Sequence, residues 1–158
     1  GRNKILWRYD PILLTEKYTV EKHLETFENM AQEIAPLVYR CIFSFVDMYK
    51  KVEENMPEII PLTEEDKVKL LKGIGEISER HNLYTQTCAT NESYEKYSIH
   101  SAGCTTWEIL EQAHGVVYKN VKASGIRQNC HCILSRDIGA YNSCLSECKY
   151  CYANRNLI

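Results

Sequence analysis

Three cysteines near the C-terminal end of the chain have a spacing that suits a metal cluster. Cys144, Cys148 and Cys151 form a Cys-x3-Cys-x2-Cys segment, and Tyr150 directly precedes the last thiol. Such a compact loop can wrap around one polynuclear centre, and a [4Fe–4S] cluster ordinarily takes four thiolates. Because the loop supplies three, one iron would stay open to a small molecule. The segment therefore predicts an iron–sulfur site with an exchangeable position.

Four further cysteines, Cys88, Cys104, Cys130 and Cys132, come from three separate segments. Cys130 and Cys132 are two residues apart, so both would point to the same face of a strand. Four thiolates predict a tetrahedral zinc site or an auxiliary [4Fe–4S] cluster. The eighth cysteine, Cys41, lies in an apolar stretch, where a free thiol is typically a small core residue.

Polar residues follow the ends of predicted strands, where α/β sheets place their chemistry. Arg8 and Asp10 come after the first strand and Asp47 after the second. We take these three as candidate catalytic residues. The alternative is that the aspartates form turns or cap helices.

The elements that must position these residues alternate between strand and helix patterns. Strands are predicted over 4–8, 38–46 and 83–87, with weaker ones over 116–118 and 130–135. Helices are predicted between Thr19 and Pro36, from Thr63 to His81, and from Thr105 to Gly115. A capping-box-like pair of Thr63 and Asp66 is expected to begin the second of these helices, and Thr105 with Glu108 is expected to cap the third. Pro11 is predicted to end the first strand, because proline lacks a donor and restricts its neighbour.

The alternation predicts an α/β fold with a parallel sheet covered by helices. A complete eight-fold barrel takes about 250 residues, and this chain has 158. We therefore expect a partial (β/α) barrel or an open parallel sheet with flanking helices, followed by a Cys-rich C-terminal metal-binding tail. Residues 1–158 would form a single α/β domain, in which 130–158 is the Cys-rich cluster-binding segment.

Composition excludes several classes of protein. Apolar residues make up 44% of the chain and the formal net charge is −2, so a largely disordered chain and a strongly basic polyanion binder are not expected. No apolar run approaches the roughly 18 residues that span a bilayer, and no secretory segment is visible at the start. The expectations are a soluble, cytoplasmic protein with no membrane partner and no nucleic-acid groove.

The Cys-x3-Cys-x2-Cys segment with Tyr150 before its last cysteine resembles the signature of the radical S-adenosylmethionine (SAM) superfamily, whose fold is a full or partial (β/α) barrel. The resemblance implies that Cys144, Cys148 and Cys151 hold a [4Fe–4S] cluster, that its open iron binds SAM, and that Tyr150 lies near the adenine. It also implies a reductant such as ferredoxin or flavodoxin. In typical members the cysteine loop follows the first barrel strand, whereas here it follows every predicted strand.

A closer resemblance is to the DUF1848 family of radical-SAM-like proteins, which carry the cysteine motif near the C-terminus. The matching stretches extend over nearly the whole chain: Trp-Arg-Tyr-Asp-Pro-Ile (7–12), Ser-Phe-Val-Asp-Met-Tyr (44–49), Cys-His-Cys (130–132), Ser-Arg-Asp-Ile-Gly-Ala-Tyr-Asn (135–142) and the tail to Asn154. The resemblance implies that the chain is the C-terminal portion of a longer one.

Three hypotheses for the function follow. The first is an iron–sulfur protein that cleaves SAM to act on an unknown small-molecule or macromolecular substrate. The second is a non-catalytic domain that binds zinc or an iron–sulfur cluster at its thiols. The third is a thiol–disulfide enzyme using Cys148 and Cys151, which ranks last because the pair does not open a helix after a strand.

Overall fold

Four parallel strands form the sheet and lie side by side in the order of the sequence. They are β1 (Leu6–Ile12), β2 (Arg40–Phe45), β3 (Thr85–Thr87) and β4 (His100–Ser101). The helices are α1 (Val20–Ile34), α2 (Lys50–Asn55), α3 (Glu64–Arg80) and α4 (Trp107–His114), and short 3-10 turns cover Arg2–Lys4, Ala35–Leu37 and Glu95–Tyr97. The computed structural model describes residues 1–88, 90–119, 129–136, 138–146, 148–151 and 153.

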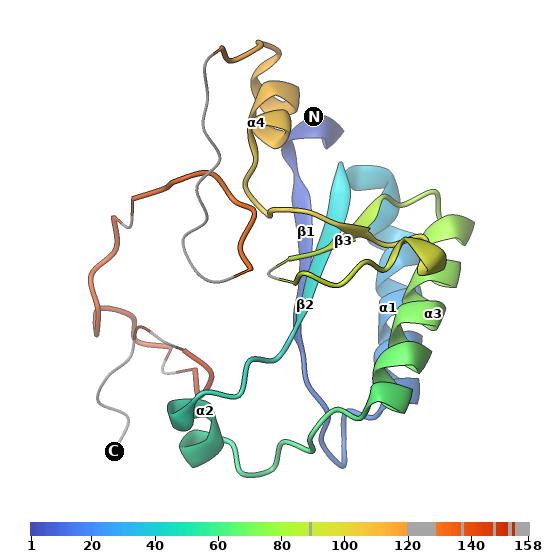
Figure 1. Ribbon diagram of the computed structural model, residues 1–158, viewed down its shortest axis with the longest axis vertical. Helices are drawn as coiled ribbons and strands as arrows, with labels where there is room; N and C mark the ends of the chain where they lie inside the picture. The colour runs from blue at the N-terminus through green and yellow to red at the C-terminus, as the bar shows by residue number, and fades with distance from the viewer. Residues whose placement is uncertain (89, 120–128, 137, 147, 152, 154–158) are drawn as a thin grey trace.

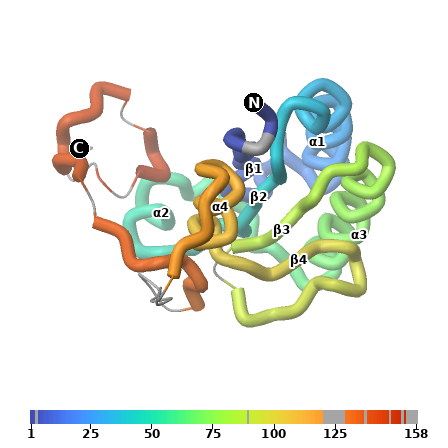
Figure 2. Tube along the Cα trace, turned by 90° about the horizontal axis from the view of Figure 1, so that it is seen from above, coloured from blue at the N-terminus to red at the C-terminus, as the bar shows by residue number. Residues whose placement is uncertain are grey.

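Helices α1 and α3 pack together on one side of the sheet, whereas α2 and the cysteine-rich segment lie on the other (Figures 1 and 2). Both packed helices carry an apolar stripe that they bury. The ring of Phe27 on α1 stacks on Trp7 of β1 at 5.0 Å between centroids, and Leu70, Leu71 and Ile74 of α3 are fully or almost fully buried. The predicted α/β class, a parallel sheet with flanking helices, is confirmed.

The strands separate apolar from polar side chains by alternation. Trp7, Cys41 and Phe43 belong to the core against α1 and α3. Residues one position along, such as Arg8 and Gln86, point to the opposite face because successive strand side chains alternate. The face of the sheet away from α1 and α3, hereafter the polar face, therefore carries Arg8 and Gln86, whereas Thr85 lies on the core face and bonds Ser78 of α3 at 2.7 Å.

The helix caps explain where two of the helices begin. Thr63 and Asp66 form a capping box at the start of α3, as the sequence predicts. At α4 the cap is Thr106, whose side chain accepts from the Ile109 amide at 3.3 Å. The prediction of Thr105 was wrong by one residue, because the helix begins at Trp107 and the extended residue before it is Thr106; the Thr105 carbonyl accepts the amide of Ile133 at 2.9 Å.

Several predicted strand boundaries need correction. Strand β1 continues through Pro11 to Ile12, which is possible because β1 is an edge strand and proline is tolerated there. Residues 116–118 and 130–135 do not form strands. The β-branched side chains of Val116 and Val117 are exposed, so their strand propensity has no packing surface to satisfy.

Helix α2 and strand β4 were not predicted, because one has six residues and the other two. Within the described part of the chain, none of the helices has the length and apolar character needed to cross a membrane.

Candidate metal centre

Three thiols meet on the polar face of the sheet. The sulfur atoms of Cys88, Cys104 and Cys132, hereafter the thiol group, all lie within 4.8 Å of one another. Cys104 Sγ and Cys132 Sγ are 3.4 Å apart. Cys88 and Cys132 are buried and Cys104 is half-buried. Cysteine sulfur is a preferred ligand of zinc and of iron–sulfur clusters, so this group could hold a metal ion.

Backbone contacts bring the three segments of the thiol group together. Cys88 directly follows β3, and its amide donates to the carbonyl of Phe43 at 3.2 Å. Cys104 follows β4, and the segment around it lies against the segment around Cys132. A Cβ atom on Gly103 would lie only 2.5 Å from the carbonyl oxygen of His131 and 2.8 Å from the Cys132 nitrogen. Only glycine permits this approach, which places Cys104 beside Cys132.

Cys130 lies next to the thiol group. It is half-buried, and its thiol is within hydrogen-bonding reach of the Cys132 thiol. The structure thus brings together three of the four cysteines predicted to share a site, and it places the fourth in contact with one of them.

Arg8 supplies a positive charge to the thiol group. Its guanidinium forms an ion pair with Asp10 and also donates to Cys104. The pKa of Cys104 is lowered to about 4 by a hydrogen bond from Cys88, with further contributions from Cys132 and Arg8. The same hydrogen bond, together with burial, raises the pKa of Cys88, and burial raises that of Cys132 to about 11. Of the three thiols, Cys104 is therefore the one that most readily loses its proton.

Asp10 connects the thiol group to β2. It accepts from Arg8 Nε at 3.1 Å and from Ser44 Oγ at 3.3 Å. The predicted candidates Arg8 and Asp10 thus lie beside the thiol group. Asp47, the third candidate, lies in the wall of a pocket that includes Cys88.

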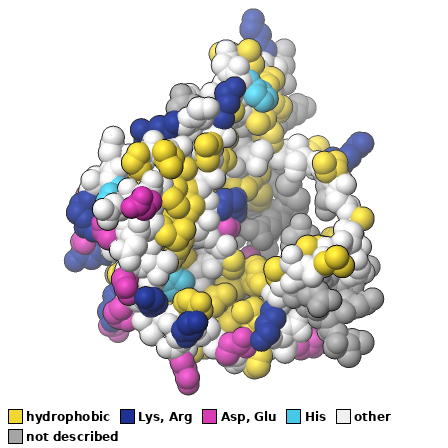
Figure 3. Space-filling model, turned by 180° about the vertical axis from the view of Figure 1, so that it is seen from behind, with side chains coloured by type: hydrophobic (Ala, Val, Ile, Leu, Met, Phe, Trp, Pro, Cys, Tyr) yellow, Lys and Arg dark blue, Asp and Glu magenta, His cyan; other side chains and the backbone are white. Residues whose placement is uncertain are grey.

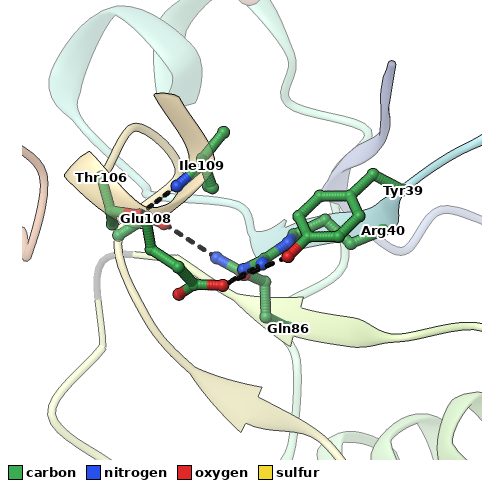
Figure 4. Close-up of polar contacts among 7 residues, drawn as sticks. Tyr39, Arg40, Gln86, Thr106, Glu108 and Ile109 are labelled. Atoms are coloured by element: carbon green, nitrogen blue, oxygen red, sulfur yellow. Dashed lines mark hydrogen bonds and ion pairs between the residues drawn. The ribbon is translucent and has the colours of Figure 1, made fainter. Parts of the chain in front are cut away.

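A buried arginine on the same face holds the backbone that leads into Cys104 (Figure 4). Arg40 donates to Gln86 Oε1 and to Glu108 Oε1, each at 2.6 Å. Gln86 in turn donates through Nε2 to the carbonyl of Gly103 at 2.9 Å. Sequence reasoning missed Arg40, Gln86 and Glu108. One signal was available, because Arg40 is a charged residue within the otherwise apolar strand predicted over 38–46.

We expect Arg40→Met to destabilise the protein by about 2 kcal/mol, because buried Gln86 would lose its donor. The melting temperature should fall by about 4–8 °C, measured by thermal unfolding. Glu108→Gln is the control. The Glu108 side chain is 67% exposed against 3% for Arg40, so removing its charge should cost less than about 1 kcal/mol. Equal effects of the two variants would contradict the role given to Arg40.

The C-terminal cysteines lie apart from the thiol group. Cys144 and Cys148 are exposed and Cys151 is half-buried. The Cys151 amide donates to the Cys148 carbonyl at 2.9 Å, which forms a tight turn. Among the residues that the structure describes, the thiol group is the only set of three potential ligands within 4.8 Å, and the structure does not bring these C-terminal thiols into such a set.

Helix α2 and the residue before it bind the backbone of the C-terminal loop. Tyr49 Oη donates to the carbonyl of Tyr150 at 2.7 Å, and Lys51 Nζ donates to that of Cys151 at 2.9 Å. The contacts come from residues about 100 positions earlier, so the loop is attached where the chain leaves β2. Sequence reasoning missed Lys51, since α2 was not predicted.

Comparison with known protein families identifies a match over nearly the whole chain. A family model described as a domain of unknown function, DUF1848, matches residues 1–153. No curated protein and no solved structure matches the chain. The description of the family assigns no activity.

Proposed function

The chain belongs to the DUF1848 family, and on that premise we propose that it is an iron–sulfur protein that uses SAM to act on a substrate. The observation that carries the proposal is the buried group of Cys88, Cys104 and Cys132 on the polar face of a parallel sheet. Buried thiols gathered from three segments are typical of a metal site rather than of core packing.

The donor set of the thiol group fits a soft metal. Sulfur ligands select zinc or iron–sulfur clusters over magnesium and calcium. Cys130 would be the fourth ligand, since its thiol already contacts that of Cys132. Four thiolates around a divalent ion leave a net charge of about −2, and the guanidinium of Arg8 at Cys104 would offset part of it.

We assign the [4Fe–4S] cluster that reacts with SAM to Cys144, Cys148 and Cys151. When bound, this cluster supplies the electron that cleaves the sulfonium of SAM, and the protein supplies orientation and the exclusion of water. Tyr49 and Lys51 hold the loop by its backbone carbonyls, and the Tyr49 ring lies 5.9 Å from that of Tyr150. Tyr150 would lie beside the adenine.

The candidate catalytic residues would have different tasks. Asp10 accepts hydrogen bonds from Arg8 and Ser44, so it orients the guanidinium and is poorly placed to remove a proton. Asp47 is exposed and lies in a pocket wall with Cys88. We therefore propose Asp47 as the residue that contacts the substrate.

The proposal requires an external electron donor, such as ferredoxin or flavodoxin. Over the lower part of the face in Figure 3, charged side chains of both signs lie interspersed with hydrophobic ones. A surface of mixed charge does not favour a polyanion, in keeping with a protein or small-molecule partner.

Anaerobic reconstitution with iron and sulfide tests the proposal. We expect about four irons and four sulfides per cluster, and Cys148→Ala should lose those of the C-terminal loop. Ser143→Ala is the matched control, because it alters the same loop at a hydroxyl that donates to the carbonyl of Ala140 and removes no thiol. The loaded chain should then retain radiolabelled SAM in equilibrium dialysis. Zinc without iron or sulfide would instead identify a non-catalytic zinc domain.

A further inference from the structure

Two cysteines of the thiol group are almost close enough to form a disulfide. Cys104 Sγ and Cys132 Sγ lie 3.4 Å apart, whereas bonded sulfur atoms lie about 2.05 Å apart. Neither residue is part of a disulfide in this structure. Closing the remaining distance of about 1.3 Å requires rotation of the two side chains about their Cα–Cβ bonds.

The backbone on both sides of the pair holds the two cysteines opposite each other. Before the first of them, Gly103 packs so closely that a Cβ atom there would lie 2.5 Å from the carbonyl oxygen of His131. After it, the carbonyl of Thr105 accepts the amide of Ile133 at 2.9 Å. Extended backbones joined by such a bond lie about 5 Å apart, which is within the Cα separation of about 4.4–6.8 Å that a disulfide spans. The bond can therefore form without a movement of the backbone.

The two thiols differ in exposure, which gives the order in which they would react. Cys104 is half-buried, whereas Cys132 is 3% exposed. Cysteines that respond to oxidants are accessible to solvent and often lie next to a second cysteine that completes the disulfide. An oxidant from solution would therefore meet Cys104 first. The guanidinium of Arg8, which contacts Cys104, has donors for the oxygen that leaves a peroxide.

We propose that Cys104 and Cys132 are a modification site, at which a hydroperoxide such as hydrogen peroxide joins the two thiols in a disulfide and so releases the metal of the thiol group. The Cys104 sulfur attacks one peroxide oxygen, and the O–O bond breaks. The other oxygen leaves as hydroxide and takes up the thiol proton to become water.

The second step consumes the sulfenic acid that the first step forms on Cys104. The Cys132 sulfur attacks the Cys104 sulfur, the S–S bond forms, and the S–O bond breaks. The hydroxyl leaves with the Cys132 proton as a second water. The two sulfurs together lose two electrons, which the peroxide gains.

The disulfide would empty the metal site, because the thiolate is the form of cysteine that binds metals and two ligands would be lost together. Metal release rests on the proposed function, which assigns a metal to the thiol group. The disulfide itself requires only Cys104 and Cys132. A dithiol would reverse the modification by thiol–disulfide exchange.

Peptide mapping after peroxide treatment tests for the disulfide. The metal-loaded chain is treated with hydrogen peroxide, alkylated and digested with trypsin. Peptide 97–119, which contains Cys104, should be linked to peptide 128–136, which contains Cys132. The linked pair should be about 2 Da lighter than the sum of the reduced peptides, because two hydrogen atoms are lost.

Two variants show which thiols form the link. Cys132→Ala should lose it. Cys130→Ala is the matched control, because it changes the same peptide and keeps the proposed pair, so its link should remain. A link that survives in Cys132→Ala, or one that joins Cys104 to Cys88 instead, would overturn the assignment.

Zinc is the probe for metal release, in the Cys148→Ala chain so that the C-terminal loop lacks one of its thiols. Peroxide should transfer zinc to a chromogenic chelator in step with the appearance of the link. Reduction with a dithiol, followed by its removal, should restore zinc binding. A link that forms while zinc stays bound would overturn the proposed release.

The outcomes separate this inference from the proposed function. A chain that binds metal but forms no link would overturn the inference and leave the proposed function intact. A chain that forms the link but never binds metal would support the disulfide and reject the metal assigned to the thiol group. Metal content is therefore measured on each sample before peroxide is added.

Discussion

Cys132→Ala is expected to weaken metal binding at the thiol group and to leave unchanged any iron bound at the C-terminal loop, where the proposed function assigns a cluster. Cys132 Sγ is 3.4 Å from Cys104 Sγ, and its side chain is buried, so water cannot easily replace it as a ligand. Structural zinc sites contribute about 10–16 kcal/mol, or about 3 kcal/mol for each of four thiolates. The affinity should fall by about a hundredfold, measured by competition with a chromogenic chelator under anaerobic conditions.

Cys41→Ala is the matched control for this result. Cys41 is fully buried among core residues, as the sequence predicts, and burial raises the pKa of its thiol. Its replacement should lower stability while the metal affinity stays the same. A Cys132→Ala chain that binds metal as tightly as the Cys41→Ala chain would rule out the thiol group as a metal site.

Gly103→Ala should weaken the same metal site without removing any ligand. The new Cβ would meet backbone atoms of His131 and Cys132 at 2.5–2.8 Å, and backbone cannot move aside as a flexible side chain can. The segment around Cys132 would shift away from Cys104. We expect at least a tenfold loss of metal affinity, because metal sites tolerate ligand displacements of only about 0.2 Å, together with a lower melting temperature.

Gly115→Ala separates loss of geometry from loss of stability. Gly115 has a φ of +74° and no atom near its missing Cβ. Alanine there should cost about 1–2 kcal/mol, the penalty for a left-handed backbone, and should leave metal affinity unchanged. Similar metal affinities for the Gly103 and Gly115 variants would show that the close approach at Gly103 is unimportant to the site.

The fold was predictable where local pattern and tertiary packing agree. The amphipathic spacing of α1 and the Thr63–Asp66 box of α3 define both helices, and alternation with buried strands identifies the parallel sheet. Helix α2 and strand β4 are too short for periodicity to detect. The opposite error is a predicted strand that does not form. Val116 and Val117 have the β-branched side chains that strands favour, but both are exposed and lie outside any strand.

The candidate site was predictable as a set of residue types rather than as a geometry. Cysteine spacing separated Cys41, the C-terminal loop and the remaining four cysteines, and the structure brings three of those four, Cys88, Cys104 and Cys132, together. The partners of Arg40 lie 46 and 68 residues away, so only the sheet order reveals that they meet. The closeness of Arg8 to Cys104 likewise depends on the fold.

The sequential order of the strands has a consequence for how the protein forms. Each strand pairs with the one synthesised just before it, so the sheet can assemble in order as the chain leaves the ribosome, where domains fold as they emerge. The thiol group cannot form strand by strand, because Cys132 is synthesised after Cys88, Cys104 and all four strands. A metal that needs all three can be captured only after the sheet is complete, which makes metal acquisition a late step in folding.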